Sequence, residues 1–219
     1  MVCVQKSSTF QSLSSGDITH SERIELRLFI SFLNQILAQP FNPIGILFAR
    51  NKWLCAQLLW MAERDQRNRK RFARTHLTQR AILQLSNLDQ NHTQRMKQIV
   101  RRHGWPGEAL VGPMGANAAW LLVQHADHDL AFQKTCLTLL ESAVQRGDAP
   151  PRHLAYLIDR IRVAEELPQV YGTQFHGQAE PLPIENEAKV DERRAAMGLE
   201  PLADYVKLMN EMRGNRKSK

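Results

Sequence analysis

Apolar residues recur every three or four positions through the first half of the chain, which is the spacing of one face of an α-helix. The pattern covers residues 22–39, 47–72 and 78–102, and it predicts three helices there. A polar stretch at 87–91 suggests an interruption in the third of them. The string His103–Gly107 holds two glycines and a proline, so we expect it to form a turn.

The second half of the chain shows the same helical spacing in shorter pieces. We expect helices over residues 115–126, from about 130 to 144 and over 153–166, with one or two more between 188 and 212. Residues 168–184 carry the only β-like signal, a mixture of aromatic, β-branched and turn residues. A short hairpin or an extended flap would suit that segment.

These elements predict an all-α fold: an irregular bundle of antiparallel helical hairpins with a short extended flap near residues 170–184. No fixed period recurs along the chain, so a regular solenoid is not expected. We divide the chain into a mobile leader, an N-terminal helical extension, a single helical domain and a basic tail, at residues 1–20, 21–50, 51–212 and 213–219.

The composition is typical of a globular protein, because 43% hydrophobic and 23% charged residues exclude wholesale disorder and collagen. No apolar stretch reaches the roughly 18 residues of a membrane span, and no export signal opens the chain. Cys3, Cys55 and Cys136 are odd in number and irregularly spaced, which favours reduced thiols over a disulfide framework. We therefore expect a soluble, cytoplasmic protein that does not contact a membrane.

The positive charge is concentrated near the predicted second helix. Residues 50–75 carry eight Lys or Arg against two acidic residues. Such a patch can bind nucleic acid or anionic lipid, but it can equally pack against an acidic part of the same protein or stay solvated. No nucleic-acid-binding motif accompanies the patch, so nucleic acid is not the expected partner.

Residues 124–129 form the densest group of potentially reactive side chains. On a continuous helix, His125, His128 and Asp129 would lie on one side, where two imidazoles and a carboxylate could hold a divalent metal. His125 could instead belong to an acid–base pair. A structural interpretation also stays open, in which Asp127 or Asp129 caps the next helix and the histidines fill a turn.

Two other groups combine charge with hydrogen-bonding capacity. Asp65 and Arg69 lie one helical turn apart, which is typical of a surface ion pair, although Arg69 could also grip an anion beside Gln66. Asp159 and Arg160 are neighbours that point about 100° apart on a helix, so each needs a partner elsewhere.

The predicted flap begins with polar side chains around a glycine, more typical of a recognition loop than of a packing strand: Gln169, Tyr171, Thr173 and Gln174.

Several of these strings occur together and in order. They read DQxxR from Asp65, HGWP from His103, AAWLLVQHAD from Ala118, AYLxDR from Ala155 and QxYGTQ from Gln169. Over about residues 55–206 the chain resembles a widespread bacterial family of helical proteins of unknown function. The resemblance implies no reaction and no cofactor.

The polar residues of these strings fall on different predicted elements. We expect them to converge on one small-molecule pocket between helices, with Trp105 or Tyr171 as a wall. The expected ligand-binding residues are Asp65, Gln66, Arg69, His103, Trp105, Gln124, Tyr156, Arg160, Gln169, Tyr171, Thr173 and Gln174.

Two classes of function fit such a pocket. In an enzyme, His125 would be the general acid or base for hydrolysis or group transfer, and Asp127 or Asp159 would orient it. Arg69 or Arg160 would then hold an anionic group of the substrate. In a non-catalytic interaction or scaffold module, the same polar side chains would form a structural network that fixes the packing of the helices.

Overall fold

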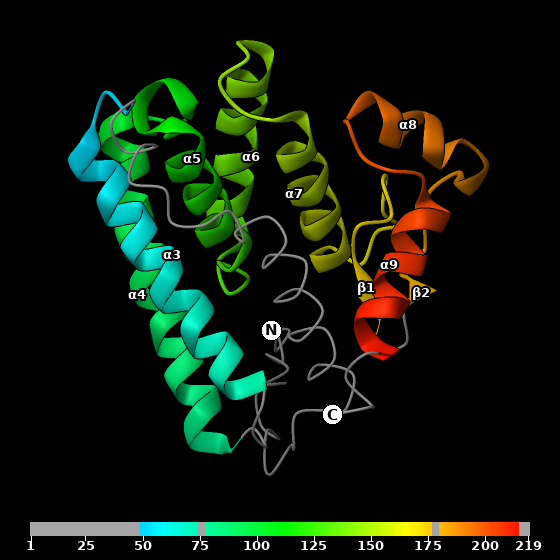
Figure 1. Ribbon diagram of the computed structural model, residues 1–219, viewed down its shortest axis with the longest axis horizontal. Helices are drawn as coiled ribbons and strands as arrows, with labels where there is room; N and C mark the ends of the chain where they lie inside the picture. Colours follow the sequence, from blue (N-terminus) through cyan, green and yellow to red (C-terminus); the bar gives the residue numbers. More distant parts are fainter. Residues whose placement is uncertain (1–48, 74–77, 177–179, 215–219) are drawn as a thin grey trace, which may run out of the picture.

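The computed structural model of the protein describes residues 49–73, 78–176 and 180–214, which form seven α-helices and a two-stranded sheet (Figure 1). This confirms the all-α class. The expected leader at 1–20 and almost all of the expected extension at 21–50 lie outside the described residues.

The first two described helices are joined at one end and run antiparallel at one side of the molecule (Figure 1). They are α3 (Lys52–Ala73) and α4 (Gln79–His103). Asn51 begins α3, since its Oδ1 accepts a hydrogen bond from Leu54 N at 2.9 Å. Thr78 begins α4 in the same way, with Ala81 N donating to its Oγ1 at 3.3 Å. Gly104 ends α4 with a φ of 69°, a left-handed conformation that favours glycine.

The interruption expected at 87–91 is wrong, because α4 is continuous through this stretch. Leu85 and Leu88 are buried and keep the apolar face in register, whereas Asn87 and Asn91 are exposed. Polar side chains that face solvent do not break a helix whose opposite face is held by packing.

The third helix, α5 (Glu108–Gln124), passes through the centre of the bundle and is buried along most of its length. It begins earlier than expected and is kinked at Gly112, whose φ of 70° and ψ of 168° are not helical and which precedes Pro113. A Cβ added at Gly115 would lie 3.2 Å from Cys55 Sγ. The glycine therefore allows α3 and α5 to approach closely.

A second antiparallel hairpin packs beside α5, formed by α6 (Leu130–Gln145) and α7 (Pro151–Ala164). Of the two aspartates considered as the cap of α6, Asp129 has this role, accepting from Phe132 N at 3.1 Å. Trp120 of α5 stacks on His153 of α7 with ring centroids 4.4 Å apart, and its Nε1 donates to His153 O at 3.0 Å. These contacts lock α7 against α5.

The remaining elements lie beyond α7: β1 (Phe175–His176), β2 (Glu180–Pro181), the short 3₁₀ helix η1 (Glu187–Lys189), α8 (Val190–Ala196) and α9 (Leu202–Gly214). The two strands pair antiparallel, which confirms the predicted flap. Arg194 is fully buried and fastens this region, donating to Tyr171 O at 2.7 Å and to Glu200 O at 2.6 Å.

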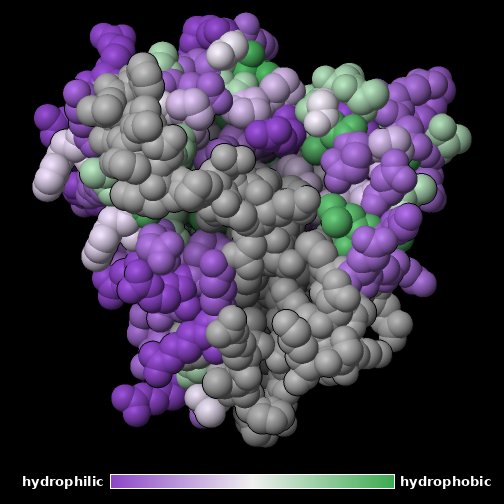
Figure 2. Space-filling model, in the orientation of Figure 1, coloured by the Kyte–Doolittle hydropathy of each residue, from purple (hydrophilic) through white to green (hydrophobic). Residues whose placement is uncertain are grey.

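The outward surface of α3 and α4 is strongly hydrophilic over their lower parts in the view of Figure 2. Among the described helices, none combines the length and the apolar character that crossing a bilayer would require.

Candidate functional site

The buried face of α3 is apolar in the first half of the helix and carries charged side chains in the second half. Leu54, Leu58 and Met61 are buried at helical spacing, and the same stripe continues with Asp65 and Arg69. Asp65 is fully buried and accepts hydrogen bonds from Arg69 Nε at 3.1 Å. A carboxylate and a guanidinium therefore occupy positions where the helix pattern calls for apolar side chains.

His125 follows the last residue of α5 and brings an imidazole to this carboxylate. Its Nδ1 lies 2.8 Å from Asp65 Oδ2, and Gln66 Nε2 donates to the same oxygen at 2.8 Å. Asp65 thus faces His125, a contact that was not anticipated from the sequence, and the orienting role expected for Asp127 stays a prediction. The sequence does not reveal this contact, because Asp65 and His125 are 60 residues apart along the chain. They meet because α3 and α5 pack side by side.

Burial and charge set the protonation of this pair. Burial lowers the pKa of His125 to about 4, and the positive charge of Arg69 adds to the shift against the opposing effect of Asp65. Burial alone would raise the pKa of Asp65, but His125 and Arg69 outweigh it and hold that pKa below its ordinary range. At neutral pH the pair is an ionised carboxylate beside a neutral imidazole.

Arg69 also contacts a second carboxylate, Asp89 of α4. Burial raises the pKa of Asp89 to about 6 against the opposing charge of Arg69, and the nearby charges of Asp65 and Asp127 add to the rise. Sequence reasoning gave Asp89 no role. We call Asp65, Arg69, Asp89 and His125 the Asp65 cluster.

A second charged contact lies next to this cluster and connects α5, α6 and α7. Asp127 accepts two hydrogen bonds from Arg160, each 2.6 Å long, and one from Gln133 Nε2 at 3.3 Å. Arg160 also reaches Gln174 Oε1 at 3.4 Å. The expectation that Arg160 needs a distant partner is thus confirmed, and the partner is Asp127.

Asp159 serves the loop that follows α7. Its carboxylate accepts hydrogen bonds from Val170 N at 2.7 Å, from Tyr171 N at 3.0 Å and from both the backbone and the hydroxyl of Thr173 at 2.9 Å. These hydrogen bonds show that Asp159 shapes the loop after α7, and the orienting role expected for it beside His125 stays a prediction.

The loop also holds itself together through Gln169. The side-chain Oε1 accepts from Gln174 N at 2.6 Å, and Nε2 donates to Gln174 O and Leu182 O at 2.9 Å each. The side chains of Gln169 and Thr173 thus bind the chain itself. That Tyr171 and Gln174 read a ligand stays a prediction.

A family model for a family of unknown function, DUF6624, matches residues 53–218. The chain belongs to this family. The matched segment takes in α4 to α9 and all but the first residue of α3, so both the Asp65 cluster and the Asp127–Arg160 contact lie inside it. No curated protein and no solved structure matches this DUF6624 protein.

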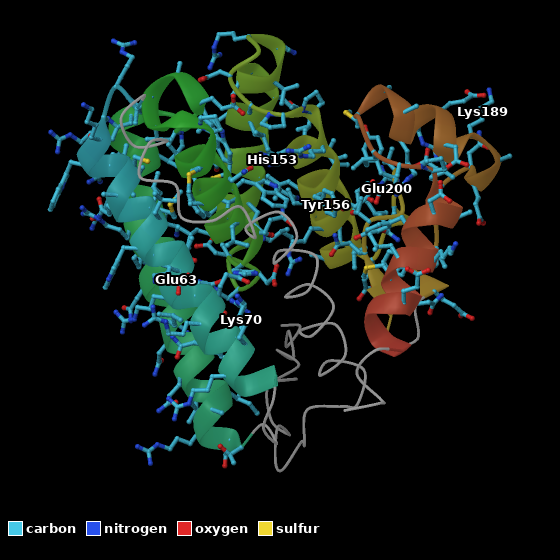
Figure 3. The ribbon with its side chains drawn as sticks, viewed as in Figure 1. Glu63, Lys70, His153, Tyr156, Lys189 and Glu200 are labelled. Carbon is cyan, nitrogen blue, oxygen red and sulfur yellow. The ribbon has the colours of Figure 1, made fainter. Side chains whose placement is uncertain are left out.

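Several predicted site residues of the DUF6624 fold lie away from the Asp65 cluster. His103 is exposed at the end of α4, eleven residues and therefore roughly 16 Å along the helix from His92. Trp105 is buried in the apolar core. Tyr156 lies on α7 near His153 (Figure 3), with its ring edge-on to Trp120 at 5.8 Å. These three residues therefore do not lie with the Asp65 cluster, and the single convergent pocket stays a prediction.

The three residues predicted to hold a metal do not form a metal-ligating group in this DUF6624 structure. Asp129 caps α6 and pairs with Lys97 at 2.5 Å, while His125 faces Asp65 and His128 is exposed. Over residues 49–73, 78–176 and 180–214, no group of three His, Cys, Asp or Glu is arranged to hold a metal ion.

Some of the buried polar atoms without hydrogen-bond partners belong to residues that contact or adjoin the Asp65 cluster. Within the described part of the chain they include Gln66 Oε1, both amide atoms of Gln124 and His92 Nδ1. Gln66 contacts Asp65, Gln124 precedes His125, and His92 interacts electrostatically with Asp65. Buried polar atoms are rarely left unpaired in folded proteins, so these atoms point to a place where polar groups are bound.

Sequence reasoning missed His92 as well as Asp89, although a signal was present. His92 lies on the apolar face of α4 between Leu88 and Met96, and all three side chains are buried. A polar residue on a stripe that otherwise enters the core needs either a buried partner or a ligand.

Proposed function

We propose that the protein is an acid–base enzyme that acts on a polar small molecule by hydrolysis or group transfer, with His125 as the proton acceptor. The contact between His125 and Asp65 is the observation that carries the proposal. A buried carboxylate that faces Nδ1 of a neutral imidazole fixes the tautomer, so that Nδ1–H donates to Asp65 and the opposite ring nitrogen accepts a proton.

In the hydrolytic form of the reaction, a water oxygen attacks the electrophilic centre and its proton passes to His125. The bond to the leaving group breaks, and the same proton then passes from His125 to that group, so the site returns to its starting state. Asp65 stabilises the imidazolium that exists between the two transfers. Arg69 disfavours that cation and thus favours the return of the proton.

The groups around the pair support this chemistry. Gln66 hydrogen-bonds to Asp65 and Gln124 precedes His125 in the sequence, and both carry buried amide atoms without a hydrogen-bond partner among the described residues. Carboxamides in this setting can position a polar substrate through directed hydrogen bonds.

The test compares His125→Ala with His128→Ala, an exposed histidine three residues away. Both variants and the wild type are assayed against chromogenic p-nitrophenyl esters, phosphates and glycosides, with unfolding followed in denaturant. We expect hydrolysis of one of these classes by the wild type and by His128→Ala, and loss of at least about 100-fold in His125→Ala. Absence of hydrolysis by the wild type contradicts the hydrolytic form of the proposal, and equal activity in His125→Ala contradicts the role of His125 in either form.

A structural network is the second candidate, favoured by the fact that Arg69 joins carboxylates of α3 and α4 while Arg160 joins α7 to the loop between α5 and α6. On this view, His125→Ala lowers the free energy of unfolding by several kcal/mol and no variant changes an activity. The same experiment therefore separates the two candidates.

A further inference from the structure

A groove opens between α3 and α4, separate from the residues proposed to do chemistry. It has a volume of about 280 Å³, near the lower end of the range for small-molecule pockets. Gln57, Trp60, Met61 and Arg64 line it from α3, and they are spaced so that they share one face of that helix. The facing residues of α4 include Asn91, His92 and Arg95.

The two cations of this groove are not neutralised by neighbouring acids. Arg95 donates to Gln57 Oε1 at 3.1 Å and to Gln98 Oε1 at 2.9 Å, which are both uncharged amides. Arg64 lies over the ring of Trp60, 5.5 Å from its centroid. Within the described part of the chain neither arginine pairs with a carboxylate, and the groove lining contains no acidic residue. The groove is therefore complementary to an anion.

Trp60 gives the same groove a flat apolar wall. Its side chain is 60% exposed although the ring borders a hollow, and Met61 and Leu88 supply a buried apolar floor. Exposed tryptophan beside arginine is the combination that stacks planar rings and binds phosphate. The carboxamides of Gln57 and Asn91 are suited to the donor and acceptor atoms at the edge of a purine.

His92, which lies between the Asp65 cluster and this groove, is a further sign that a polar group enters the groove. It lines the groove, is 6% exposed, and its Nδ1 has no hydrogen-bond partner among the described residues. An unpaired buried nitrogen is costly to keep unless something binds it.

We propose that the groove between α3 and α4 binds a nucleoside phosphate, with the base against Trp60 and the phosphate on Arg64 and Arg95. This goes beyond the proposed function and does not depend on it, because neither Asp65 nor His125 lines the groove.

The test titrates the full-length protein with adenosine 5′-monophosphate, adenosine and inorganic phosphate by isothermal calorimetry. Trp60→Ala removes the stacking wall and Arg64→Ala removes one cation. Matched controls come from the same helix: Trp53 is 82% exposed and Arg67 is exposed beside Glu63, and neither lines the groove. Circular dichroism establishes that each variant is folded.

We expect the monophosphate to bind more tightly than adenosine or phosphate alone. Affinity should fall about tenfold or more in Trp60→Ala and by a similar factor in Arg64→Ala, while Trp53→Ala and Arg67→Ala bind as the wild type does. Failure of the monophosphate to bind, or equal weakening in test and control variants, overturns the proposal. Equal weakening would indicate a longer polyanion that follows the whole basic face of α3.

Discussion

Arg69 is a buried charged side chain that is paired with two carboxylates. Its side chain is 9% exposed and lies between the carboxylates of Asp65 and Asp89. The spacing is typical of a surface ion pair, with anion binding by Arg69 as the alternative, and the structure places the pair in the interior. Spacing along a helix predicts which two side chains can meet, but burial depends on which neighbour covers them.

Two pairs on α3 have the same spacing and different burial, so they give a matched comparison. Arg67 and Glu63 are largely exposed at 3.1 Å, whereas Arg69 and Asp65 are buried at the same distance. We expect Arg69→Met to lower the free energy of unfolding by about 3 kcal/mol, because it leaves buried carboxylates without their cation. Arg67→Met should change it by less than about 0.5 kcal/mol. Equal effects in urea-induced unfolding would contradict the burial of Arg69.

At the scale of elements, the segment after α7 owes its shape to a carboxylate rather than to strand pairing. Its two strands are only two residues long, and Asp159 binds three backbone amides of the preceding loop. The sequence predicted an extended flap here but assigned its polar residues to ligand recognition. The helices can be recognised from the spacing of apolar residues in the sequence. A side chain that binds loop amides produces no such periodic pattern, so its role cannot be recognised in this way.

Asp159→Asn tests this arrangement. An amide offers one acceptor oxygen and places an NH₂ group where the loop also presents donors, so we expect a loss of about 2–3 kcal/mol in the free energy of unfolding. Hydrogen exchange at Val170, Tyr171 and Thr173 should accelerate more than exchange in α5. Asp204→Asn, at an exposed position of α9, serves as the control. Unchanged exchange in the loop would show that the carboxylate is dispensable.

For the whole molecule, the buried titratable groups make stability depend on pH in the acidic range. The pKa of His125 is lowered to about 4 and that of His153 to about 3, in both cases chiefly by burial. The unfolded chain therefore takes up these protons first as pH falls below about 6.5, and the folded state loses stability. Asp89 acts in the opposite direction, since its raised pKa of about 6 favours the folded state on acidification.

His153→Phe isolates one of these contributions while retaining an aromatic partner for Trp120. Between pH 6 and 4 we expect the free energy of unfolding to fall less steeply with decreasing pH in the variant than in the wild type. The two slopes should differ by about 1.4 kcal/mol per pH unit. Unfolding in urea at several pH values measures this slope, with His128→Ala as a control that keeps the wild-type dependence. An unchanged slope in His153→Phe would show that this histidine is protonated equally in both states.

The whole bundle also shows how far sequence reasoning reached. Most helix positions in the described part of the chain followed from local patterns, and so did the choice of Asp127 or Asp129 as the cap of α6. The meeting of Asp65 with His125 did not, since it depends on how α3 packs against α5. Contacts between elements are set by tertiary packing, which one sequence records only indirectly.

The labelling rates of the two buried cysteines can show whether the helices of the bundle separate together or one at a time. Cys55 Sγ lies where α3 meets α5, whereas Cys136 is enclosed on α6, and burial raises its pKa to about 12. A thiolate-seeking reagent such as iodoacetamide can reach either sulfur only when its surroundings open. Equal labelling rates at both sites would mean that the bundle opens as one unit. Faster labelling of Cys55 would mean that α3 detaches while α6 stays in place.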